Sequence, residues 1–374
     1  MSSQQPQSVA VWIPFLLTAM VSLIFGLLAS LWRLGVSFGE YNPTIAQLHG
    51  PLMVSAFLGT LIGIERAVSW KSIFAALAPI ASGIGIIAVA LFPHSRYPVG
   101  LFILSATALT ILFIQVGLQF KARHLLVMGL GAAQWMIGNI FWFMGFSFHF
   151  IVPWWMGFLV FTIVGERLEL NRLLPQSFRA TLMFWSGVIL MILGTAILPL
   201  AFSTGIGVIA CGWILAGIWL LQHDITRHTI KTTGLSRFIA VSLIAGYVWM
   251  IIGGIIAFWK GLPTGGFYYD AILHAILVGF VFSMIFGHAP IIFPAILKLK
   301  IVYQPYFYGH LLLLHVGLLI RIGGDLLHSL YWKQVGGVIN VIAVLVFLGA
   351  TASSVLLGII QHKRQTTVQT HVHS

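Results

Sequence analysis

The feature that most constrains this chain is a succession of apolar runs, each about 20 residues long and separated by short polar gaps. A run of that length can cross the hydrocarbon layer of a bilayer as a helix. Because backbone polar groups in lipid must be satisfied within the segment, each run is expected to be helical. Twelve runs are predicted, over residues 10–32, 45–64, 72–92, 98–120, 124–146, 151–170, 180–201, 204–222, 237–259, 268–293, 305–323 and 335–360.

The gaps are too short to hold a separate soluble domain, so the sequence predicts an all-α polytopic membrane protein. It would have a polar N-terminal tail over 1–9, one twelve-helix membrane domain over 10–360 and a polar C-terminal tail over 361–374. Only 7% of the 374 residues are charged, against about 25% in soluble domains. This excludes a cytosolic enzyme and a disordered protein. The single cysteine, Cys211, excludes a disulfide-built domain, and the first run is expected to be a retained span, not a signal peptide.

Basic residues are distributed unequally between the two sides of the predicted helices. Of the 19 Lys and Arg residues, five lie on the side away from the termini (Arg33, Arg96, Lys260, Arg321 and Lys333), and the other 14 lie on the side of the termini. Loops rich in Lys and Arg stay in the cytoplasm. Both termini are therefore predicted to be cytoplasmic, in a cytoplasmic membrane of prokaryotic type. The lipid bilayer is the expected partner of this basic chain, and no nucleic-acid-binding module is found.

A short pattern in the second run recurs in the sixth. Counting each position forward by 101 residues, the matches are Phe57-Leu58 with Phe158-Leu159, Ile62 with Ile163, and Glu65-Arg66 with Glu166-Arg167. The tenth run, four further on, carries a Gly-containing apolar segment over 278–282. The twelve helices are therefore predicted to form three pseudo-repeated four-helix arcs. The alternative is a chance similarity between apolar helices.

Two histidines inside predicted helices carry the argument for a site. His49 lies about one turn into the second run and His274 about two turns into the tenth, and both runs cross from outside to inside. At a rise of about 1.5 Å per residue, both lie at similar depth in the outer leaflet. Ionisable side chains within a membrane are functional candidates. Two imidazoles at one depth on different helices can coordinate an iron porphyrin from both faces. The alternative for each is a hydrogen-bonded packing residue.

The sequence around these histidines resembles a known family. The segment over 48–53, Leu-His-Gly-Pro-Leu-Met, resembles the start of helix 2 in subunit I of the haem-copper oxidases, and the segment over 268–274 is similar to that family's helix 10. The resemblance implies twelve helices in three arcs, with His49 and His274 as axial ligands of a haem b. It also places Arg321 near the arginines that bind the haem propionates.

Two further observations refine the resemblance. His274, Gly287-His288 and Arg321 are also similar to a series in the NnrS family, which consists of twelve-helix haem proteins tied to nitric oxide tolerance. The oxidase family has a His-x-His on helix 10, whereas Ile272 and Ile276 stand at those spacings here. The sixth and seventh runs also lack an interior histidine for copper. The usual oxygen-reducing centre is therefore not encoded, and it stays open whether the chain is an oxidoreductase of the haem-copper/NnrS type.

A second polar cluster is expected at the inner helix ends. Its members are Glu65, Arg66, Glu166, Arg167, Glu169, His288 and His310. One interpretation is a second metal site for copper, iron or zinc, with His288, His310 and Glu166 as ligands. Another is a proton path through Glu65, Glu169 and the mid-membrane His315. The third is a set of ion pairs that hold the helix ends.

The predicted function is a haem-binding membrane protein that handles electrons or a diatomic gas, nitric oxide or oxygen. An electron donor would meet the haem b at the outer face. The alternatives are a repeat-built transporter or channel with the Glu/His cluster as its ion path, and an assembly factor for a respiratory complex.

Overall fold

The computed structural model describes residues 11–36, 41–70, 72–92, 95–172, 174–297 and 302–372, and these form helices and turns without a β-strand. Twelve helices are long and apolar enough to cross a membrane. This confirms the predicted all-helical, twelve-span architecture and indicates a multi-pass membrane protein. The polar tail predicted over 1–9 lies outside the described residues.

The spans are built from the following elements, in chain order: α1 (Ile13–Arg33); α3, η2 and α4 (His49–Pro51, Leu52–Leu58 and Gly59–Ser69); α5 (Ile73–Leu91); α6 (Tyr97–Gln119); α7 (Arg123–Phe143); α8 (Phe148–Asn171); α9 (Phe178–Ile197); α10 (Phe202–His223); α12 (Gly234–Lys260); α13, η3 and α14 (Phe267–His274, Ala275–Phe282 and Ser283–Leu297); α15 (Phe307–Leu326); and α16 (Leu330–Val372). Two short helices, α2 (Pro43–Gln47) and α11 (Thr226–Thr229), lie in the connections.

Several helix ends follow from local side-chain chemistry. Asn42, Ser72 and Ser177 precede α2, α5 and α9, and each side chain accepts a hydrogen bond from a backbone N–H of the first turn. Such caps satisfy donors that have no partner within the helix. At the end of α12, Gly261 has a φ of +64°, a conformation that glycine adopts without a steric penalty.

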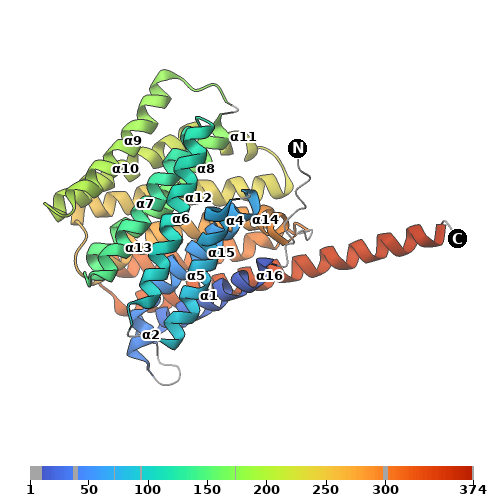
Figure 1. The fold of residues 1–374 in the computed structure, drawn as a ribbon, viewed down its shortest axis with the longest axis horizontal. Helices are drawn as coiled ribbons and strands as arrows, with labels where there is room; N and C mark the ends of the chain where they lie inside the picture. Colours follow the sequence, from blue (N-terminus) through green and yellow to red (C-terminus); the bar gives the residue numbers. More distant parts are fainter. Residues whose placement is uncertain are drawn as a thin grey trace.

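Consecutive spans pack side by side along much of the bundle, notably α6 with α7, α7 with α8, α9 with α10, and α15 with α16. The most buried span is α8 and the least buried is α16, so α8 lies at the centre and α16 at the periphery. Figure 1 shows α16 projecting beyond the other helices. Its 43 residues make it about 65 Å long. The helix continues through the segment predicted as a polar tail from residue 361 and ends at Val372.

Two spans change their winding in the middle. The segments η2 and η3 are π-helical, and the remainder of each span is α-helical. Single π-turns inside α-helices are rare, and those that do occur are often found at functional sites. Here η2 begins three residues after His49 and η3 begins directly after His274. The second predicted arc has no counterpart, because α8, the sixth span, is α-helical from Phe148 to Asn171, and the three-arc repeat stays a prediction.

Candidate functional site

His49 and His274 line one cavity of about 590 Å³. The cavity lies at the end of the bundle where α1 ends and α13 begins, called the cavity end below. Most of its wall is apolar, and it includes Leu27, Met53, Val54, Met156, Val278 and Phe282. Volumes of about 300 to 1,000 Å³ and mostly apolar walls are typical of sites for small molecules and cofactors. The two residues with matching predicted depth therefore share a space of cofactor size.

Both imidazoles are held in the same way. His49 Nδ1 lies 2.9 Å from the carbonyl oxygen of Gly26, and His274 Nδ1 lies 2.8 Å from that of Asp270. A carbonyl only accepts, so Nδ1 carries the hydrogen in each ring and Nε2 keeps its lone pair. A hydrogen bond of this kind fixes the tautomer and the orientation of metal-ligating histidines. Each side chain is thus prepared to donate Nε2 to a metal.

Gly26 brings α1 close enough to support His49. A Cβ atom at this position would lie 2.5 Å from Met53 Sδ, so a side chain here would require the side chain of Met53, which lines the cavity, to move. The absence of a side chain lets the carbonyl of Gly26 reach the imidazole. Sequence reasoning missed this contact, since no side chain signals which backbone carbonyl faces a neighbouring helix.

Asp270 connects His274 to the basic residues of the cavity end. Its carboxylate accepts two hydrogen bonds from Arg321, from Nε at 2.8 Å and from Nη2 at 2.9 Å. Lys333 Nζ lies 3.4 Å from Asp270 and 3.4 Å from the buried Asp325. Arg321, predicted from the resemblance to bind propionates, does line the cavity, but two of its N–H groups are directed at Asp270.

Arg33 and Lys333 also line this cavity. The sequence counted both residues only as basic charges of the outer side. Asp270 stood within the segment that resembles helix 10, but no role was predicted for it. Its spacing of four residues before His274 is one helical turn, which is the signal that could have indicated the support of the imidazole by a preceding carbonyl.

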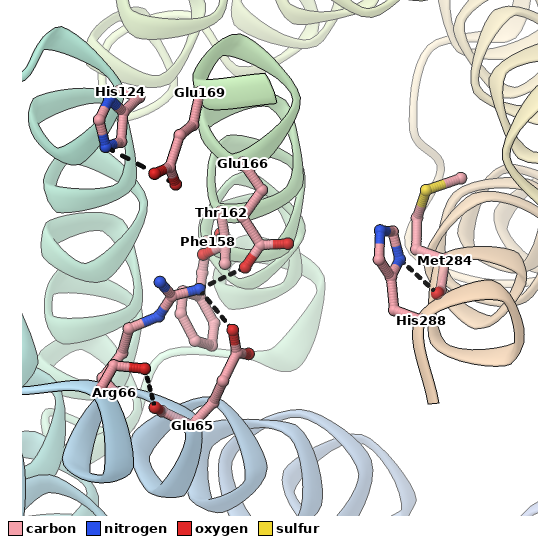
Figure 2. A network of polar contacts seen from close by, with 10 residues as sticks. Glu65, Arg66, His124, Phe158, Thr162, Glu166, Glu169, Met284 and His288 are labelled. Atoms are coloured by element: carbon pink, nitrogen blue, oxygen red, sulfur yellow. Dashed lines mark hydrogen bonds and ion pairs between the residues drawn. The ribbon is translucent and has the colours of Figure 1, made fainter. Parts of the chain in front are cut away.

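The opposite end of the bundle holds the second polar cluster (Figure 2). Arg66 Nη2 donates to Glu65 at 3.0 Å and also to Glu166, so one guanidinium joins α4 to α8. Glu169 lies 3.7 Å from His124 of α7. These contacts correspond to the interpretation of the cluster as ion pairs that hold helix ends. They also occupy Glu65 and Glu169, the carboxylates predicted for a proton path.

Arg167, which matches Arg66 in the predicted repeat, contacts a different group. Arg167 Nε lies 3.8 Å from Asp224, whose carboxylate also accepts a hydrogen bond of 2.8 Å from Tyr247. Both Arg167 and Asp224 are buried. This network joins α8 to α12 and to the residue that follows α10, and it has a structural role.

The three residues predicted as ligands of a second metal are not brought together. In Figure 2, His288 of α14 stands apart from Glu166, and its Nδ1 lies 2.8 Å from the carbonyl oxygen of Met284. His310 is buried among the rings of Phe238, Phe286, Phe307 and Phe347. Across the described part of the chain, no group of three His, Cys, Asp or Glu side chains is arranged to hold a metal ion.

His315, which was predicted to lie near the middle of the membrane, has a different partner. Its Nδ1 accepts a hydrogen bond of 3.0 Å from the indole of Trp249. This contact joins α15 to α12, and it corresponds to a hydrogen-bonded packing residue. His288, His310 and His315 therefore differ from His49 and His274, which line one cavity.

Comparison with known proteins gives one match. Residues 12–356 match a family model described as a domain of unknown function, DUF8744. The matched range includes every cavity residue named above and all twelve spans apart from the last part of α16. No curated protein and no solved structure matches the chain.

Proposed function

The chain belongs to the DUF8744 family, and we propose that it is a haem b-binding membrane protein that transfers electrons, with His49 and His274 as the axial ligands. The observation that supports this most is the pair of histidines from two separate spans in one cavity, each with Nδ1 bonded to a backbone carbonyl. Haem b bound between two imidazoles supplies one-electron chemistry.

The other residues of the cavity suit an amphiphilic porphyrin. Apolar side chains such as Leu27, Met53 and Phe282 would surround the macrocycle and keep water from it. Basic side chains are found in the same wall, from Arg33, Arg321 and Lys333, where carboxylates of the ligand could be bound. Apolar walls with a few placed polar groups are the usual composition of a cofactor site.

The proposal extends to orientation and to the physiological reactant. We place the cavity end at the outer face of a cytoplasmic membrane, because only five of the 19 Lys and Arg residues fall on that side of the predicted spans. An electron donor would then dock at the outer face. The resemblance to the haem-copper oxidase and NnrS families favours a diatomic gas, nitric oxide or oxygen, as the reactant that the electrons serve.

A reduced-minus-oxidised absorption spectrum of the purified protein tests the proposal. A b-type haem signal is expected in the wild type, and it should be lost in both His49→Ala and His274→Ala. His288→Ala is a matched control, because His288 also lies in the tenth span and also directs Nδ1 at the carbonyl four residues before it. That variant should keep the spectrum.

Two results would contradict this function. Protein isolated without haem from a haem-replete host would remove its basis and favour the repeat-built transporter with a Glu/His ion path. Loss of the spectrum in His288→Ala together with its retention in His49→Ala would place the haem at the opposite end of the bundle.

A further inference from the structure

We propose that Arg33, and not Arg321, binds a carboxylate of the ligand in the cavity. This rests on the proposed haem site and deepens it. The ligand would be an anionic amphiphile whose apolar body lies among the cavity walls and whose carboxylate lies at the end of α1.

Arg321 is already paired. Its guanidinium makes two parallel hydrogen bonds to the carboxylate of Asp270, at 2.8 and 2.9 Å. The side chain of Arg321 is only 6% exposed. Paired, bidentate contacts of this kind are the strong class of hydrogen bond between charged groups. A ligand carboxylate would have to compete with Asp270 for this buried cation.

Lys333 is also shared between acidic side chains. Its ammonium lies 3.4 Å from Asp270 and 3.4 Å from Asp325, and Asp325 is fully buried. Arg321 and Lys333 therefore both lie against a carboxyl group already. A ligand anion would have to displace one of these contacts to bind either cation.

Arg33 is different on each of these points. It is the last residue of α1, its side chain is exposed, and it lines the cavity. Within the part of the chain that the structure describes, it makes no ion pair. Its charge lies within electrostatic range of His49 and of Tyr269. Among the described residues it is thus a cation without an acidic partner, beside one of the two proposed ligands.

A guanidinium with its donors available is well matched to a carboxylate, because its N–H groups form a planar fork. The cavity then combines a mostly apolar interior with Arg33, which has no acidic partner within the described ranges of the chain. A porphyrin with propionate groups has this distribution of properties, whereas a fully apolar molecule would leave Arg33 unused.

The test compares haem with haem dimethyl ester, in which both carboxylates are capped. Full-length protein is purified from haem-deficient cells, and each porphyrin is titrated by absorbance. Arg33→Gln should weaken haem binding about tenfold, which corresponds to about 1.4 kcal/mol, and should leave ester binding within about twofold. Arg33→Lys should keep most of the haem affinity. Arg96→Gln, at an outer-side arginine that does not line the cavity, is the matched control and should change neither affinity.

Arg321→Gln gives the opposite pattern under the same proposal. It should weaken haem and ester alike, because it releases Asp270, whose carbonyl positions His274. The assignment would be overturned if Arg321→Gln removed the difference in affinity between haem and its ester while Arg33→Gln kept that difference. Equal effects of Arg33→Gln on both porphyrins, or no effect on either, would also overturn it. Wild-type protein that binds neither porphyrin would instead remove the proposed haem site.

Discussion

Replacing Asp270 with leucine should destabilise the folded protein by about 3 kcal/mol. The change removes the acceptor of two hydrogen bonds from Arg321, and the side chains of Arg321 and Asp270 are only 6% and 14% exposed. Loss of one partner from a buried ion pair costs about 3 to 5 kcal/mol, because the other charge stays buried without compensation. The lower end is expected here, since Lys333 can still pair with Asp325.

The measurement is unfolding of the full chain in detergent micelles on addition of SDS, followed by fluorescence of its 13 tryptophans. The double variant Asp270→Leu/Arg321→Met removes both charges and keeps apolar bulk. It should be more stable than Asp270→Leu alone by about 2 kcal/mol, since no buried charge is then left unpaired. Together with the wild type and the single variant Arg321→Met, these two proteins form a double-mutant cycle that isolates the pairwise energy.

Two outcomes would refute this reasoning. A loss of less than about 1 kcal/mol in Asp270→Leu would mean that the buried guanidinium finds water or another acceptor readily. A double variant whose loss equals the sum of the two single losses would mean that the Asp270–Arg321 contact has no coupling energy.

Three further predictions use the same unfolding assay or the haem spectrum. Arg66→Met should lower the free energy of unfolding by about 2 to 4 kcal/mol, because it leaves the carboxylates of Glu65 and Glu166 without their shared cation. Glu169→Gln should lower it by less than about 0.5 kcal/mol, since His124 lies 3.7 Å away and the side chain of Glu169 is 39% exposed. Similar losses in the two variants would contradict the ion-pair assignment. Asn139→Leu should cost about 1 to 3 kcal/mol, because the Asn139 oxygen accepts from Trp155 at 3.0 Å and the buried indole N–H would be left without an acceptor; a loss below about 0.5 kcal/mol would show that this hydrogen bond contributes little. Gly26→Val should abolish the haem spectrum without preventing membrane insertion, and an unchanged spectrum would show that the close approach at Gly26 is not needed.

The fold was predictable because lipid imposes one requirement on every span. Backbone groups must be satisfied within the segment, so each long apolar run became a helix. The ends were less predictable. The last span was expected to stop near residue 360, yet α16 continues to Val372, because nothing in a polar segment after a span obliges the backbone to leave the helix.

The cavity was predictable in depth but not in detail. Counting residues along two spans placed His49 and His274 at similar levels, and both line one cavity. The supports were not foreseen, since the carbonyl of Gly26 comes from a helix 23 residues away in sequence. The same limit explains His310. Its level along the helix could be counted, but in a span that is apolar on every side its direction around the axis could not, and its ring lies among phenylalanines.

The two π-helical segments let their spans lose a residue without turning the two ends of the span relative to each other. A π-turn holds more residues than an α-turn, so deleting one residue from η2 or η3 would let the segment relax to the ordinary winding. In an α-helical segment, by contrast, removing one residue turns everything beyond it by about 100°. A one-residue deletion inside η2 or η3 is therefore expected to keep the two ends of the span near their present faces, whereas the same deletion in α4 or α14 would turn the end of that span away from its neighbours.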